Sequence, residues 1–136
     1  MATHLQTALD VPAAISRLPS ACFKLASLTA VIGVSMGIYM GVAEDHSLAP
    51  VHVHLNLIGW VSLFLFGLFY KSHPNAIGIA AVVQVAVVSV GYIVMLSGLA
   101  GLLLTASPAF FPLTLIGSLL VWSGFVMFFA IVVWRA

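Results

Sequence analysis

The chain has 136 residues, of which 63% are hydrophobic and only 5% charged, and its mean hydropathy is +1.26. So few polar groups could not cover the surface of a water-soluble domain, and the composition indicates an integral membrane protein. A formal net charge of +1 gives no basis for a nucleic-acid partner, and the single cysteine, Cys22, excludes an internal disulfide.

The N-terminal residues 1–20 are mixed in polarity and lack the layout of a cleaved secretory signal, so we expect a short cytoplasmic arm there. Residues 21–136 are expected to form one all-α domain, an integral membrane four-helix bundle. A membrane span needs about 20 apolar residues. We predict four spans, over residues 22–41, 51–70, 76–99 and 109–134.

Two stripes of glycine indicate close helix packing, because small residues allow helices in lipid to approach each other. Gly33, Gly37 and Gly41 repeat at a spacing of four in the first span, and they predict a smooth face against another helix of the same chain. Gly117 and Gly124 form a weaker stripe in the fourth span.

Basic residues predict the orientation, because they are retained on the cytoplasmic side of a membrane. With four spans, all four basic residues fall at the same side: Arg17, Lys24, Lys71 and Arg135. The loop after the first span instead carries Glu44, Asp45 and His46. We therefore predict a multi-pass protein with both termini in the cytoplasm.

Two histidines, His52 and His54, open the second span in the sequence Pro-Val-His-Val-His-Leu-Asn-Leu-Ile-Gly-Trp, residues 50–60. In an α-helix they point about 200° apart and cannot bind one metal ion together. A helix N-terminus disfavours imidazolium, so both are expected to be neutral, which is the form that binds metal. An equally weighted interpretation is an interfacial pair that only forms hydrogen bonds to the loop.

The other predicted spans contain no histidine; His46 lies in the outer loop, and His4 and His73 lie on the inner side. If two histidines hold a haem, the second one must therefore come from another copy of the chain. A two-fold dimer would pair His54 with His54, whereas a ring would pair His52 of one subunit with His54 of the next.

The segment His-Val-His-Leu-Asn-Leu-Ile-Gly-Trp, followed by Leu-Phe-Leu-Phe-Gly-Leu-Phe-Tyr at residues 63–70, resembles histidine-bearing helices of a known superfamily. This is the catalytic subunit of haem-copper oxidases and nitric oxide reductases, which has twelve spans in three four-helix arcs. The chain resembles one arc. The resemblance implies a homotrimer, favoured over a dimer, that mimics the twelve-helix core in a bacterial cytoplasmic membrane.

The resemblance also implies a cofactor, haem b, held between His52 of one subunit and His54 of its neighbour. Gly33, Gly37 and Gly59 would make room for the macrocycle. The arginines that commonly hold haem propionates in the family are missing here, and His46 and Ser47 are the candidates to replace them.

Electron transfer is the function expected from this site, because two axial ligands leave iron no open position. The donor and acceptor are unknown, and quinone is one candidate. Enzymatic activity is not favoured, because the family's copper or non-haem iron site needs more histidines and the third span has none. The alternatives are a minimal oxygen or nitric oxide reductase whose metal site is completed by Glu44, Asp45 or His46, a gas-binding haem protein, and a cofactor-free membrane scaffold.

Overall fold

The computed structural model describes residues 17–135 and shows an all-α protein with four long apolar helices that could span a membrane. The first is α2 (Leu18–Ala43), the third α5 (Ile79–Thr105) and the fourth α6 (Phe111–Arg135). The second span is continuous from Ala49 to Ser72 but has three parts: α3 (Ala49–His54), the π-helical segment η1 (Leu55–Ser62) and α4 (Leu63–Ser72). Two single 3₁₀ turns, η2 (Pro74–Ala76) and η3 (Pro108–Phe110), precede α5 and α6.

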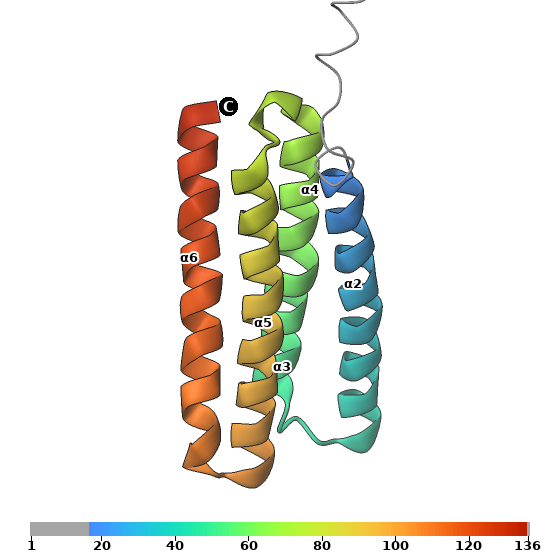
Figure 1. The fold of residues 1–136 in the computed structure, drawn as a ribbon. Coiled ribbons are helices and arrows are strands. Elements are labelled where there is room, and N and C mark those ends of the chain that lie inside the picture. The colour runs from blue at the N-terminus through green and yellow to red at the C-terminus, as the bar shows by residue number, and fades with distance from the viewer. Residues whose placement is uncertain (1–16, 136) are drawn as a thin grey trace, which may run out of the picture.

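The four helices stand side by side, each antiparallel to the next one in the chain (Figure 1). The second span contacts both α2 and α5, and α5 contacts α6. The middle two helices bury a larger share of their residues than α2 and α6 do. The outer helices therefore leave broad apolar faces exposed, including Val42 on α2 and Trp122 on α6.

The helix ends follow ordinary capping chemistry. Pro19 lies in the first turn of α2, which begins at Leu18, before the predicted start of the first span. Residues 18–20 of the predicted arm thus belong to α2, and residues 1–16 lie outside the described part. Glu44 and Ala106 adopt the left-handed conformation that ends α2 and α5. The Ser107 hydroxyl accepts a hydrogen bond from the Ala109 amide at the start of η3.

The basic residues lie at one end of the molecule. The start of α2, the end of α4 and the end of α6 all lie at the top of Figure 1, and the turn into α3 lies at the opposite end. Arg17, Lys71 and Arg135 belong to these top ends. This placement keeps the prediction that the two ends of the described chain share one side of the membrane, with α3 near the other side. We call the two ends inner and outer accordingly.

Helices α5 and α6 pack backbone against backbone. A Cβ atom added at Gly98 would lie 2.5 Å from the Thr114 amide nitrogen, and one at Gly91 would lie 2.8 Å from the Val121 nitrogen. One at Gly117 would overlap the backbone of Met95. The seven-residue spacing on both helices keeps the glycines on one face of each, which brings the two backbones together.

A buried polar contact joins the second span to α5. The Tyr70 hydroxyl donates to Gln84 Oε1 over 2.9 Å, and both side chains are fully buried. Aromatic rings extend the same region to α6, where Phe66 lies 4.5 Å from Phe128 between ring centroids. A buried amide is stabilised by a partner in an apolar interior, and here Tyr70 supplies one for the Gln84 oxygen, whereas Gln84 Nε2 has none.

We expect Tyr70→Phe to lower the free energy of unfolding by about 1 kcal/mol, because it leaves Gln84 Oε1 buried without a donor. Tyr39→Phe is the matched control, since Tyr39 is 69% exposed. Thermal unfolding of both variants in the same detergent measures the difference. Equal midpoints for the two variants would show that the Tyr70 hydrogen bond contributes nothing.

Candidate functional site

The candidate site begins at the outer loop, where Asp45 organises the approach to α3. The Ser47 backbone amide donates to Asp45 Oδ1 over 2.9 Å, and this hydrogen bond lowers the pKa of the Asp45 carboxyl below its ordinary value. His46 and Ser47 are both exposed. Pro50 lies in the first turn of α3, where its missing amide hydrogen costs no helical hydrogen bond.

His54 lies at the end of α3 with one ring nitrogen engaged. Its Nδ1 atom is 2.7 Å from the Pro50 carbonyl oxygen. A carbonyl can only accept, so Nδ1 carries the hydrogen and the neutral ring has its lone pair on Nε2. The side chain is half-buried. Metal-binding histidines are commonly fixed by this kind of bond to a backbone carbonyl, so His54 has the chemistry of an iron ligand.

His52 has a different environment. Its ring lies over Gly37 of α2, and a Cβ atom at Gly37 would be 2.9 Å from His52 Cε1 and 3.5 Å from Nε2. On the other side of the ring, Asn56 Nδ2 lies 3.3 Å from His52 Nδ1 and donates to the His52 carbonyl oxygen over 2.9 Å. In this chain, therefore, the two histidines are separated, and His52 packs against α2.

The glycine stripe of α2 faces the second span over part of its length. A Cβ atom at Gly33 would overlap the Asn56 amide, whereas one at Gly41 would meet nothing within 4 Å. Gly33 and Gly37 thus leave room for Asn56 and His52 of the same chain. That they and Gly59 also line a haem stays a prediction.

We expect Gly37→Ala to displace the His52 ring, because the added methyl group would occupy its place. The free energy of unfolding should change by less than about 1 kcal/mol, since the ring can turn and alanine favours the helix. Gly41→Ala is the matched control. Mass spectrometry of diethyl pyrocarbonate adducts should show faster modification of His52 in Gly37→Ala alone, and equal rates in both variants would contradict the contact.

The π-helical segment η1 follows His54 directly. The Thr29 hydroxyl of α2 donates to the Gly59 carbonyl oxygen, and Ser62 donates to the Leu57 carbonyl oxygen over 2.8 Å. Gly59 is buried between Thr29 and Tyr92, and a Cβ atom there would lie 3.1 to 3.3 Å from both. Two carbonyl oxygens of the π-helical segment thus have side-chain hydroxyl partners, one from α2 and one from the segment itself.

Regular α-helical geometry was expected through the whole second span, whereas the structure is π-helical directly after His54. Both histidines lie in α3, so their separation of about 200° is unaffected. Two residues of the site were missed as contributors. Asn56 stands four residues after His52, and Thr29 stands four before Gly33, so each continues a helical face already recognised. That spacing was the available signal.

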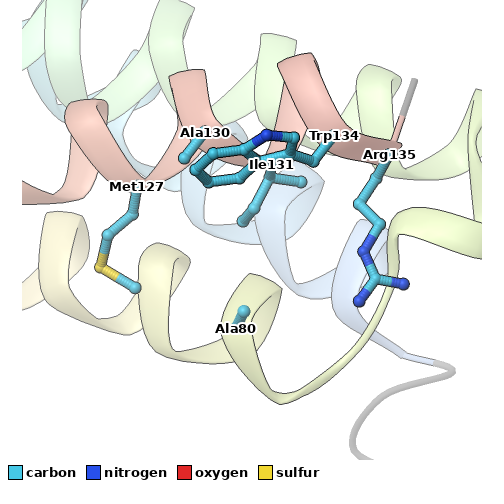
Figure 2. Close-up of a pocket in the computed structure, with 6 residues that line it drawn as sticks. All are labelled: Ala80, Met127, Ala130, Ile131, Trp134 and Arg135. Atoms are coloured by element: carbon cyan, nitrogen blue, oxygen red, sulfur yellow. The ribbon is translucent and has the colours of Figure 1, made fainter.

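A cavity lies away from His52 and His54, at the other end of the helices. It has a volume of about 270 Å³ and lies at the inner end, between the start of α5 and the end of α6. Figure 2 shows Trp134 and Ile131 over it, with Ala80 opposite and Arg135 at one side. No histidine lines it, so it does not contribute to the candidate site.

Within residues 17–135, no three histidine, cysteine, aspartate or glutamate side chains form a group that could hold a metal ion. Comparisons with protein-family models, curated proteins and solved structures found no match to this chain.

Proposed function

We propose that the chain is a haem b-binding membrane protein that transfers electrons. The observation that carries this proposal is the hydrogen bond from His54 Nδ1 to the Pro50 carbonyl oxygen, which leaves Nε2 free as a ligand atom on a half-buried side chain. His54 would hold the iron on one side. When bound, haem b supplies reversible one-electron chemistry.

A second histidine ligand would come from a neighbouring copy, because His52 and His54 of one chain diverge and His73 lies at the inner end. A homotrimer would pair His52 with His54 across each interface, as the family resemblance implies. A two-fold dimer would pair His54 with His54. Both arrangements leave iron without an open position, which favours electron transfer over gas chemistry.

The surroundings of His54 suit a flat apolar macrocycle. Leu57, Val61 and Leu65 are exposed on the same span, at 56%, 40% and 55% of their full surface. No charged side chain occurs between Asp45 and Lys71. These residues would exclude water from the bound group and keep the local dielectric low. At the outer edge, His46 and Ser47 are accessible to hydrogen-bond the propionates.

The test is a reduced-minus-oxidised visible spectrum of the detergent-purified chain, made in cells with ample haem, together with haem and metal quantification. The expected result is a b-type spectrum with two nitrogen ligands and no second metal. A colourless protein would overturn the proposal and favour the cofactor-free scaffold. A second metal with turnover of oxygen or nitric oxide would favour the minimal reductase.

A further inference from the structure

We infer that His52 and His54 have different roles at the proposed haem site: among the described residues of each chain, His54 alone would hold the iron, between two copies related by a two-fold axis. This inference rests on the proposed function and deepens it. The structural basis is that the two rings have different hydrogen-bond partners.

The Asn56 amide determines the tautomer of His52. Its Nδ2 donates to the His52 carbonyl oxygen over 2.9 Å, and the reversed amide would place two oxygens against each other. The same NH₂ group lies 3.3 Å from His52 Nδ1. In the proposed arrangement Nδ1 accepts the second hydrogen of this NH₂ group, which places the hydrogen of the neutral ring on Nε2. An imidazole cannot bind iron through a protonated Nε2.

The His52 ring packs against its own chain. Its Cε1 and Nε2 atoms face Gly37 of its own chain, in a space that only glycine leaves open. Gly33 leaves the corresponding space for the Asn56 amide. The two glycines and the two polar side chains thus form one seam between α2 and the second span. His52 and Asn56 act in this seam as positioning residues.

Binding through His52 would require three changes at once. Its ring would have to leave the space over Gly37, its hydrogen would have to move from Nε2 to Nδ1, and the Asn56 amide would then oppose that hydrogen. His54 requires none of these changes, since the Pro50 carbonyl oxygen already holds the hydrogen on Nδ1. His54 needs no rearrangement of its ring or hydrogen to bind iron, so His54 is the ligand in this proposal.

One ligand per chain leaves the site incomplete without a second copy, and a two-fold axis supplies an identical histidine on the opposite side. Inward of His54, the second span exposes apolar residues that a second copy would cover, among them Leu57, Val61, Leu65 and Leu68. No like charges oppose each other there, because this stretch has none.

The first experiment measures haem per chain and the mass of the purified oligomer. The expected result is one haem per two chains in a dimer. His52→Gln is expected to keep the haem and its six-coordinate spectrum, and His54→Gln to lose both. One haem per chain in a trimer, with loss of haem in both variants, would overturn the inference while supporting the proposed function. A wild-type chain without haem would overturn both.

The second experiment reads the tautomers directly and requires no haem. The haem-free wild-type chain is labelled uniformly with ¹³C and ¹⁵N, and its histidine ring nitrogens are observed by NMR and assigned through their bonds to the backbone. The expected pattern is Nε2–H for His52 and Nδ1–H for His54. Nδ1–H on both rings would overturn the inference. This measurement uses the wild-type fold, so it remains decisive if a variant does not fold.

Discussion

His54→Ala is expected to reduce haem per chain at least tenfold, the largest effect of any single histidine substitution in this protein. Even the loss of a group that orients a metal ligand commonly costs about 10 to 100-fold in affinity, and here the ligand itself is removed. Pro50 O would lose its imidazole donor at an accessible position, so the fold should be little affected. Haem quantification and far-ultraviolet circular dichroism of the same sample separate the two effects.

His73→Ala is the matched control for His54→Ala. His73 is also half-buried at the end of a helix, and its Nδ1 lies 3.2 Å from the Phe69 carbonyl oxygen, but it belongs to the inner end. The haem content of His73→Ala is expected to equal that of the wild type. Equal loss of haem in both variants would point to a general effect of histidine removal on the protein and would contradict a site at His54.

Gly117→Ala is expected to lower the free energy of unfolding by about 2 to 3 kcal/mol, at the upper end of the usual cost of overpacking. Its methyl group would overlap the Met95 backbone, which cannot turn aside as a side chain can. Helices α5 and α6 would have to separate along their whole contact. Unfolding in a detergent series, followed by circular dichroism, measures the loss.

Two further alanine variants grade the effect of Gly117→Ala. At Gly124, a methyl group would meet mainly the Val88 side chain, which can change its rotamer, so a smaller loss is expected. At Gly41, where nothing lies within 4 Å, alanine should raise stability by up to about 1 kcal/mol through its helix propensity. The loss of unfolding free energy should therefore be largest for Gly117→Ala and smaller for Gly124→Ala, and Gly41→Ala should show no loss. Three equal values would contradict backbone contact at Gly117.

The glycine repeats show that spacing in the sequence does not predict which glycines lie in a helix contact. The regular repeat of Gly33, Gly37 and Gly41 predicted a helix-packing face, yet Gly41 packs against nothing in the chain. The weaker pair, Gly117 and Gly124, lies in the closest helix contact, opposite α5. A glycine permits close approach, but the neighbouring helix determines whether it occurs, and the identity of that neighbour is not encoded in the spacing.

The same distinction applies to the histidines. The helical spacing predicted that the two side chains point in different directions, because residues two apart in an α-helix cannot bind the same metal ion. The spacing alone predicted two equivalent ligands, since nothing in a His-x-His pattern distinguishes one ring from the other. Their hydrogen-bond partners distinguish them: a backbone carbonyl for His54, and an amide from the next turn, held by a glycine of another helix, for His52.

The number, type and approximate extent of the long helices followed from hydropathy alone, because a chain in lipid must satisfy its backbone hydrogen bonds internally. The π-helical segment after His54, the glycine contact of α5 with α6 and the seam of His52 and Asn56 against α2 did not. Each involves a contact with the neighbouring helix: Thr29 with Gly59, Met95 with Gly117, and Gly37 with His52. Local composition determines that helices form, whereas side-chain chemistry at their contacts determines which ring nitrogen is free to bind.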